Sequence, residues 1–539
     1  MSLLSTVHYS LFTVFMSKSL MIQGTGSGVG KSLIVSGLCR IFSDMGIRVA
    51  PFKAQNMALN SFITKEGGEI GRAQAFQAEA ARVEPSVDMN PILLKASGEA
   101  GCQVILDGKV HSNMRADEYY GFKREAWDAV TGAYERLSGK YELIIIEGAG
   151  SPAEINLSKD EVVNMRVARH VNAPVILVGD IDKGGVFASF YGTVGLLDED
   201  AAYIRAFIIN KFRGDMNILN PGLKMIYEKT GRPVLGVIPY LGDLGLHEED
   251  GIPLERLKQF NQFERFKPLK IVVLRQRYIA NFTDFDPFMY EPDVELIYSL
   301  REGDIENADL IIIPGSKNTV KDLLFLREHG IENSIKRAVE KGIPLVGVCG
   351  GYQMLGSKIH DPYGVESAHR AIEGFGLLDI ETALEKVKTT CQVEAEIISE
   401  KWEIGTEKLR NNNRSLLLPT SYFSLPTLKG YEIHMGMTTG DVGLFRINRL
   451  NRSNSSNSSS GFVLDGSQKG NVWGTYIHGI FDNDIFRRNL INFLRRKKGL
   501  EPLEETIDYS RLRDDSLNKW AGIIRDSIDM KFIEGLING

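Results

Sequence analysis

Cysteine, positive charge and long apolar runs are all in short supply in this sequence. The 539 residues contain only four Cys and carry a formal net charge of −6. No two Cys have a CxxC spacing, which argues against a disulfide framework or a zinc knuckle and favours a reducing, cytoplasmic compartment. A protein that holds the phosphate backbone of a nucleic acid needs an excess of basic residues, which this chain lacks. We therefore expect no nucleic-acid partner. Apolar runs such as residues 143–146 are far shorter than the ~20 residues of a membrane-spanning helix, so we expect no membrane partner.

The first twenty residues are apolar and rich in hydroxyl groups, but they lack the basic region of a signal peptide. We therefore expect residues 1–18 to be an N-terminal extension, or Met16 to be the true start of the protein.

Glycine, by contrast, is abundant. The chain has 54 Gly in 539 residues, about 10% against a usual share of roughly 7%. Several of these glycines cluster beside strand-like runs. Hydrophobic residues make up 43% and charged residues 24%, which is typical of a globular protein. At about 100–200 residues per domain, the length predicts three units or two large ones.

The first half alternates continuous apolar runs with helix-like stretches. Continuous runs are typical of strands that are covered on both faces, so this order predicts an α/β fold with a doubly wound parallel sheet. Residues 31–45 read as a helix that ends at Gly46. The expected strands are residues 20–23, 49–52, 143–147, 175–178, 207–209 and 234–238.

A polar segment over residues 255–268 predicts a domain boundary, after which a second α/β series begins. Its expected strands are residues 270–274, 296–298, 310–313 and 345–348. From about Ile380 the pattern predicts scattered short strands, with loops at 411–414 and 451–460. The predicted division is an extension (1–18), a P-loop domain (19–260), a second α/β domain (268–505) and a helical C-terminal tail (506–539).

A glycine-rich loop lies between the first strand and the first helix. Backbone N–H groups of such a loop can turn towards phosphate oxygens, and the helix N-terminus adds its positive dipole end. Its lysine would neutralise phosphate charge and its serine hydroxyl would bind Mg²⁺, so the loop predicts ATP and Mg²⁺ as cofactors. The residues of this predicted site are Gly24, Thr25, Gly28, Gly30, Lys31 and Ser32.

The spacing of the loop separates subclasses of P-loop protein. Partition-type ATPases carry a signature lysine five residues before the P-loop lysine, where this chain has Gly26. The loop instead resembles that of the dethiobiotin synthetase-like branch, whose members activate carboxylates with ATP. Three strand-end residues agree: Lys53 could reach the phosphates, Glu147 could hold Mg²⁺ and Asn210 could read the adenine edge.

Two acids stand one residue apart at another strand end. Asp180 and Asp182 precede a Gly-Gly pair, at the sheet edge where α/β proteins bind ligands. We expect Asp180 to be a metal ligand, or this pair to orient a substrate carboxylate; a solvated turn is the alternative.

The second half contains the pattern of a thiol nucleophile. Cys349 follows an apolar strand in a G-x-C-x-G sequence and precedes a helix-like run. This is the layout of a nucleophile elbow, in which a strained turn exposes the side chain and a helix N-terminus favours the thiolate. A buried structural cysteine is the alternative.

A thiol nucleophile needs a base. His478 follows a strand-like run and precedes Gly479, and His434 in the sequence YEIHMG is the competitor. The turn Pro314-Gly315-Ser316 could supply a second oxyanion donor.

The elbow cysteine, the late histidine and the PGS turn together resemble class I glutamine amidotransferase domains. Many of these domains have Glu two residues after the histidine, where this chain has Ile480, so the third triad member is left open. The whole chain from about residue 19 to 505 resembles the cobyric acid synthase family. The stretches that carry this resemblance are the P-loop and elbow sequences, APFKAQNMALNS (50–61), GGEIGRAQA (67–75), DMNPILLK (88–95), GDIDKGGVFAS (179–189), YEIHMG (431–436) and GTYIHGIFDN (474–483).

The resemblance implies a two-site enzyme. Cys349 and His478 would release ammonia from L-glutamine, and ATP·Mg²⁺ would activate carboxylates of adenosylcobyrinic a,c-diamide at positions b, d, e and g. Basic residues such as Arg72, Lys95 or Arg213 would suit this acidic corrinoid. Alternatives are the sister enzyme that amidates the a and c groups, a CTP-forming amidotransferase and a partition-like ATPase switch. A homo-oligomer is left open.

Overall fold

The structure is a computed structural model, which describes residues 17–96, 101–156, 161–242, 267–398, 427–450 and 462–539. The expected extension before Met16 and the expected loops at 411–414 and 451–460 lie outside these ranges, as does most of the predicted boundary at 255–268. Within the described ranges, no helix is both long and apolar enough to span a bilayer.

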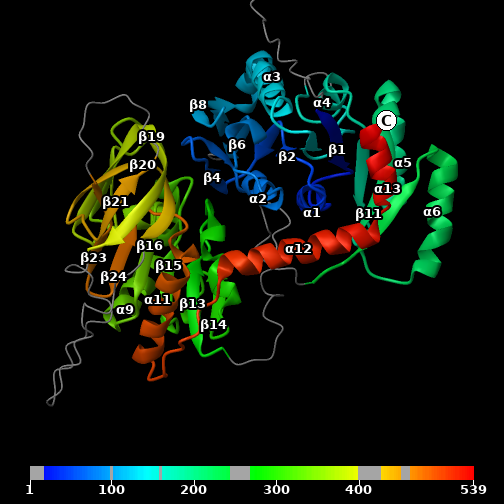
Figure 1. The fold of residues 1–539 in the computed structure, drawn as a ribbon. Coiled ribbons are helices and arrows are strands. Elements are labelled where there is room, and N and C mark those ends of the chain that lie inside the picture. Colours follow the sequence, from blue (N-terminus) through cyan, green and yellow to red (C-terminus); the bar gives the residue numbers. More distant parts are fainter. Residues whose placement is uncertain (1–16, 97–100, 157–160, 243–266, 399–426, 451–461) are drawn as a thin grey trace, which may run out of the picture.

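The first half is built on a six-stranded sheet, and its strands are those predicted from the sequence (Figure 1). All neighbours pair in parallel, and the central strands are buried along their length because helices cover both faces. The order is β12 (Val234–Pro239), β11 (Ile204–Phe212), β10 (Val175–Asp180), β1 (Lys18–Gly24), β9 (Leu143–Glu147) and β2 (Val49–Phe52).

Two hydrophobic layers cover this sheet. One face packs against α1 (Lys31–Asp44), which ends at Met45 with Gly46 in the left-handed region, as predicted. The other face packs against a second set of helices. These are α3 (Ala116–Ser138), α4 (Met165–His170), α5 (Val186–Leu196) and α6 (Met216–Thr230).

Residues 55–115 add smaller sheets at the side of this domain that faces the second half (Figure 1). One sheet orders β3 (Gln55–Met57), β6 (Ile92–Ala96), β7 (Gly101–Leu106) and β8 (Lys109–Arg115). The pair β4 (Ser61–Ile63) and β5 (Glu69–Gly71) leads into α2 (Arg72–Ala80). Ile63 of β4 shares a buried cluster with Tyr431 and Ile433, so the two halves of the chain pack against each other.

The second half holds another mainly parallel sheet, again with the predicted strands. Its order is β14 (Val294–Ser299), β13 (Leu269–Leu274), β15 (Leu310–Ile313), β16 (Leu345–Val348), β24 (Val472–Thr475) and the antiparallel β23 (Ser467–Lys469). The accompanying helices are α7 (Glu302–Glu306), α8 (Thr319–Glu328), α9 (Ile331–Glu340), α10 (Gly350–Leu355) and α11 (Asp484–Lys497).

The sequence predicts scattered short strands after Ile380, and this prediction is wrong for two strands, which are long. β19 (Ile380–Ile397) and β20 (Leu428–Gly440) form a long antiparallel pair. Cys391, Val393 and Ala395 are buried at every second position of β19, the period of a strand with one covered face. The remaining strands of this sheet are β17 (Lys358–His360), β18 (Ala371–Glu373), β21 (Phe445–Arg449) and β22 (Val463–Asp465).

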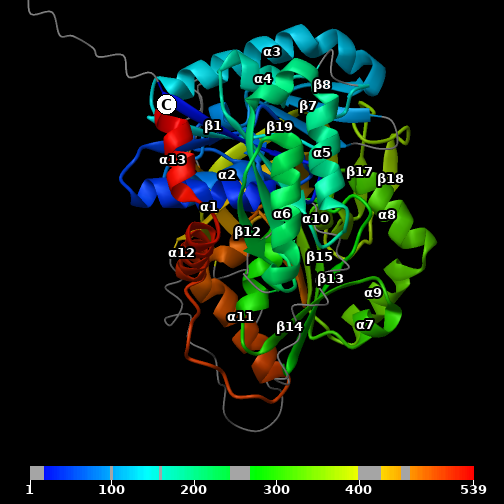
Figure 2. The same ribbon diagram turned by 90° about the vertical axis from the view of Figure 1, so that its right-hand side faces the viewer.

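The C-terminal residues are helical, as expected, and they return to the first half. Helix α12 (Tyr509–Ser527) lies beside α1, and α13 (Met530–Asn538) packs against β1 (Figure 2). Trp520 of α12 donates its indole N–H to the Leu33 carbonyl at 2.5 Å. Leu517 and Ile524 are fully buried in the same hydrophobic layer as α1, so the chain end completes the core of the P-loop domain.

Candidate active sites

The glycine-rich loop leaves β1 and enters α1 through two residues with left-handed backbone. Gly28 has φ 72° and Gly30 has φ 96°. A Cβ at Gly30 would lie 2.1 Å from Nδ2 of Asn210. Only glycine fits there, because both the backbone angle and the space exclude a side chain. Thr25 anchors the loop to the sheet through its N–H, which donates to the Val178 carbonyl at 2.9 Å.

The P-loop lysine bends back over its own loop. Lys31 Nζ donates to the Gly26 carbonyl at 2.8 Å and to the Gly150 carbonyl at 3.3 Å. Its ammonium therefore lies beside the loop backbone, the position from which a P-loop lysine can reach a bound phosphate.

Glu147 is the centre of a buried polar cluster beside this loop. The carboxylate is 1% exposed. Its Oε1 accepts from Ser32 Oγ at 2.9 Å and from Lys53 Nζ at 2.7 Å, and its Oε2 accepts from Gln77 Nε2 at 2.5 Å. Burial alone would raise the pKa of Glu147, but Lys53, Gln77 and Lys31 lower it, so the group is a carboxylate.

Ser32 and Glu147 offer two oxygen atoms that fit a magnesium ion. Mg²⁺ binds oxygen ligands at 2.0–2.1 Å in an octahedron, so two adjacent ligands are about 2.9 Å apart, as these oxygens are. No group of three or more His, Cys, Asp or Glu side chains could hold a metal in the described part of the chain. Mg²⁺ does not require one, because phosphate and water oxygens usually complete its shell.

The structure does not bring Asp180 to this pair. β10 and β9 flank β1 on opposite sides, so Asp180 and Glu147 stand on opposite sides of the loop. Asp180 Oδ1 accepts from the Asp182 N–H at 2.9 Å, and its Oδ2 lies 3.6 Å from Lys211 Nζ.

Two neighbouring residues at the end of β11 support the loop from this second side. Asn210 Nδ2 donates to the Val29 carbonyl at 2.8 Å, and Lys211 Nζ donates to the Gly28 carbonyl at 2.7 Å. Lys211 has a left-handed backbone with φ 63°, which is uncommon for a lysine. Sequence reasoning missed Lys211 and Gln77, since neither stands in a recognisable motif.

The three basic residues expected to suit an acidic substrate make different contacts. Arg72 stacks over the Phe62 ring at 5.5 Å. Arg213 stacks over the Tyr240 ring at 3.3 Å. Lys95 donates to Ser61 Oγ and to Glu69 Oε1, both at 2.8 Å, and lines the cavity beside Cys349.

Cys349 occupies a strained turn between β16 and α10. Its backbone has φ 54° and ψ −109°, outside the regions that an L-residue normally adopts. The turn closes tightly, since a Cβ at Gly351 would lie 2.0 Å from the Ile313 carbonyl oxygen. This is the geometry of a nucleophile elbow, and the Cys349 thiol donates weakly to the Ile433 carbonyl at 3.5 Å.

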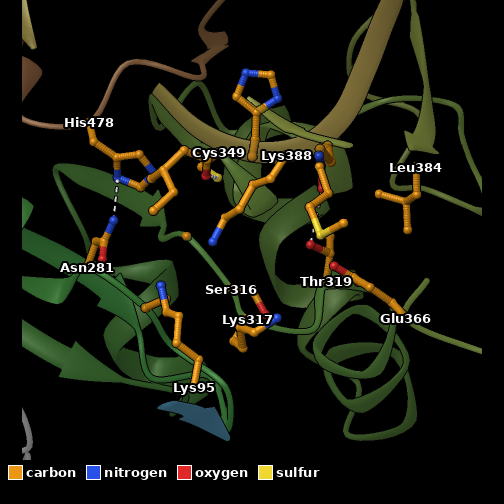
Figure 3. Close-up of a pocket in the computed structure, with 16 residues that line it drawn as sticks. Lys95, Asn281, Ser316, Lys317, Thr319, Cys349, Glu366, Leu384, Lys388 and His478 are labelled. Atoms are coloured by element: carbon orange, nitrogen blue, oxygen red, sulfur yellow. Dashed lines mark hydrogen bonds between the residues drawn. The ribbon is translucent and has the colours of Figure 1, made fainter. Parts of the chain in front are cut away.

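His478 lies on the same cavity as Cys349 (Figure 3). A Cβ at Gly315 would lie 3.3 Å from Cε1 of His478 and 3.8 Å from Cβ of Cys349, so both side chains border one small space. His478 Nδ1 is 2.6 Å from Asp284 Oδ2, while the buried Nε2 has no hydrogen-bond partner among the residues that the structure describes. The free nitrogen is therefore available to a thiol or a substrate.

Asp284 is a third member that the sequence left open. It lies on a 3₁₀ helix at Phe282–Tyr290, 194 residues from His478. Burial alone would lower the pKa of His478, but Asp284 and Cys349 raise it to about 10. At neutral pH the imidazole is thus held as a cation that can stabilise a thiolate. No spacing signal in the sequence connects the two residues.

His434, the competing base, also lines the cavity but has both nitrogens occupied. Nδ1 lies 2.7 Å from the Gly436 carbonyl oxygen, and Nε2 lies 3.3 Å from Glu432 Oε1. Its ring stacks on Tyr476 at 3.8 Å. The geometry thus favours His478 as the base.

The PGS turn stands against the elbow. A Cβ at Gly350 would lie 2.9 Å from the Ser316 nitrogen, so the backbones of the turn and of the first residue of α10 nearly touch. Ser316 Oγ donates to Asp322 Oδ2 at 2.6 Å, which fixes the turn. Two backbone segments that can carry N–H donors for an oxyanion therefore meet beside Cys349.

Each half of the chain matches a known domain. Residues 20–254 match the CobQ/CobB/MinD/ParA nucleotide binding domain. Residues 270–486 match the CobB/CobQ-like glutamine amidotransferase domain. A nucleotide-binding domain and a glutamine amidotransferase domain in one chain define a glutamine-hydrolysing carbon–nitrogen ligase.

Relatives identify the family within this class. A cobyric acid synthase of Thermodesulfovibrio yellowstonii is 48% identical, over 96% of this chain and 98% of the relative. Cobyric acid synthases of Caldanaerobacter subterraneus subsp. tengcongensis and Dehalococcoides mccartyi are 47% and 45% identical, over 96% and 97% of this chain and 98% and 99% of their own lengths. The chain belongs to the cobyric acid synthase family.

Proposed function

We propose that this enzyme uses ATP and L-glutamine to amidate the b, d, e and g carboxylates of adenosylcobyrinic a,c-diamide, giving adenosylcobyric acid. One observation carries the proposal. A chain that aligns with cobyric acid synthases over nearly its whole length holds Cys349 and His478 on one cavity, with Asp284 bonded to His478, and keeps a P-loop beside Ser32 and Glu147.

In the amidotransferase half, the thiolate of Cys349 attacks the carboxamide carbon of glutamine. The negative oxygen that forms is stabilised by backbone N–H groups of the elbow and of the PGS turn. His478 gives its Nε2 proton to the departing nitrogen, so ammonia leaves and a glutamyl thioester remains. Asp284 holds the imidazole in this orientation. The same His478 then takes a proton from water, whose attack releases glutamate and regenerates Cys349.

In the P-loop half, the substrate carboxylate would attack the γ-phosphate of ATP, and the bond to the β-phosphate would break, so that ADP leaves and an acyl phosphate forms. Ammonia then replaces phosphate to give the amide. Lys31, the loop N–H groups and the N-terminus of α1 bind the phosphates, and Lys53 is close enough to the loop to join them. Ser32 and Glu147 would hold Mg²⁺, which neutralises phosphate charge when bound.

The sister reaction, amidation of the a and c groups of cobyrinic acid, needs the same two kinds of site. The test is therefore mass spectrometry of the products formed from the corrinoid a,c-diamide with ATP and glutamine. We expect four successive one-amide steps. If the enzyme leaves the diamide unchanged but adds two amides to cobyrinic acid, it carries out the sister reaction; if it adds none to either, it is not an amidating enzyme.

A further inference from the structure

Two segments of opposite domains exchange hydrogen bonds next to the amidotransferase site. Phe282 N–H donates to Asn60 Oδ1 at 3.1 Å, and Ser61 N–H donates to Asn281 Oδ1 at 3.0 Å. Asn60 is 1% exposed and Asn281 is 2% exposed. Each asparagine thus satisfies a buried backbone N–H of the other domain, which would otherwise cost free energy. We call these four residues the asparagine latch.

The latch adjoins the carboxylate that holds His478. Asn281 Nδ2 lies 3.4 Å from Nδ1 of His478, and Phe282 begins the 3₁₀ helix that carries Asp284. Asn281 has a left-handed backbone with φ 54°, so this corner depends on its surroundings to keep its shape. A shift of the corner would move Asn281 and Asp284 together relative to the imidazole.

Tyr431 contacts His478 and also contacts the first domain. The Tyr431 ring stacks on the imidazole at 5.2 Å with an interplanar angle of 15°, and the two backbones exchange hydrogen bonds. Its hydroxyl lies 3.3 Å from the Ser61 carbonyl oxygen and 3.5 Å from Asp284 Oδ1. The first domain therefore contacts both the helix that carries Asp284 and the Tyr431 side chain that stacks on His478.

We infer that Asn60, a residue of the ATP-binding domain, is a positioning residue for glutamine hydrolysis, acting through Phe282 and Asp284 on His478. The inference rests on the proposed function. It gives the polar sequence QNMALNS a physical role, because Asn60 bonds to the segment that carries Asp284. His478 in the second domain is therefore correctly oriented only when the first domain is packed against it.

The experiment compares Asn60→Ala with Thr390→Val in the full chain. Thr390 also bonds across the interface, to the Gly67 carbonyl at 2.8 Å, but within the described part of the chain it forms no hydrogen bond to Asn281, Asp284 or His478. For Asn60→Ala we expect the kcat of glutamine hydrolysis to fall about 10-fold or more, with KM little changed and ammonia-driven amidation retained, since misplaced general bases cost roughly this much. Thr390→Val should keep the wild-type kcat.

A second readout follows the base directly. The rate at which iodoacetamide alkylates Cys349, measured by peptide mass spectrometry across pH, reports how well His478 stabilises the thiolate. Asn60→Ala should shift this profile to higher pH, and Tyr431→Phe, which removes only the hydroxyl, should shift it in the same direction by less. An unshifted profile, equal losses in Thr390→Val, or a parallel loss of ammonia-driven amidation would overturn the inference. A wild-type enzyme inactive with both nitrogen donors would instead contradict the proposed function.

Discussion

The acid that orients the catalytic imidazole comes from an unexpected residue. Domains of this class often place a Glu two positions after the histidine, where this chain has Ile480, which is 1% exposed and packed in the core. Asp284 supplies the carboxylate from another element. The chemistry requires a carboxylate at Nδ1 and not a particular place in the sequence, so the residue that provides it is found only by geometry.

The Asp284–His478 pair should make stability depend on pH. The pKa of His478 is raised to about 10 from 6.5, so the stabilisation by the pair is complete below pH 6.5, declines above it and is lost once pH passes 10. In Asp284→Asn, urea unfolding should show the largest loss of stability relative to wild type just below pH 6.5 and a smaller loss near pH 10. A pH-independent difference would show that the pair is not charged.

At the scale of elements, the two sites are both strand–turn–helix units. The P-loop places Gly30 where a Cβ would strike Asn210, and the elbow holds Cys349 at φ 54°. Such units are local, so their residues are neighbours in sequence and are recognisable there. The long pair β19 and β20 is different, because its strands join through backbone pairing across the gap between residues 397 and 428.

The two sites carry out separate steps, so substitutions in them should cause two different losses of amidation activity. Cys349→Ala should abolish glutamine-driven amidation and leave activity with high ammonia, because the acyl phosphate still forms. Lys31→Ala should stop amidation with either nitrogen source, since carboxylate activation fails. Product formation with each donor measures both effects. Loss of ammonia-driven activity in a folded Cys349→Ala enzyme would show that the two steps are not separate.

At the scale of the whole molecule, the end of the chain packs against its beginning. After the amidotransferase domain, α12 crosses back and buries Leu517, Trp520 and Ile524 against the P-loop domain. Helix α1, which begins with Lys31 and Ser32, therefore packs against residues almost 500 positions later in the sequence. The ATP site and the end of the chain are parts of one hydrophobic layer.

This packing should be visible in a substitution of Trp520. Trp520→Ala removes a 3% exposed ring and the bond to Leu33, and should cost about 3–5 kcal/mol. Hydrogen exchange should rise in α1 and in β1 but not in β13 to β16. Gly522→Ala in the same helix is the control, because its Cβ would meet no atom within 4 Å, and it should be neutral or slightly stabilising. If hydrogen exchange in Trp520→Ala rose equally in both halves of the chain, the effect of Trp520 would not be local to the P-loop domain.

The two α/β sheets, the phosphate loop and the elbow cysteine can be predicted from the amino-acid order alone. Buried parallel strands appear as continuous apolar runs, and tight turns require glycine next to the functional residue, so both leave local marks. It takes the folded chain to reveal that Asp284 meets His478, that Gln77 meets Glu147 and that Asn60 reaches Phe282. These contacts join polar side chains over long stretches of chain, and their free energy depends on burial and orientation, which no spacing along the sequence encodes.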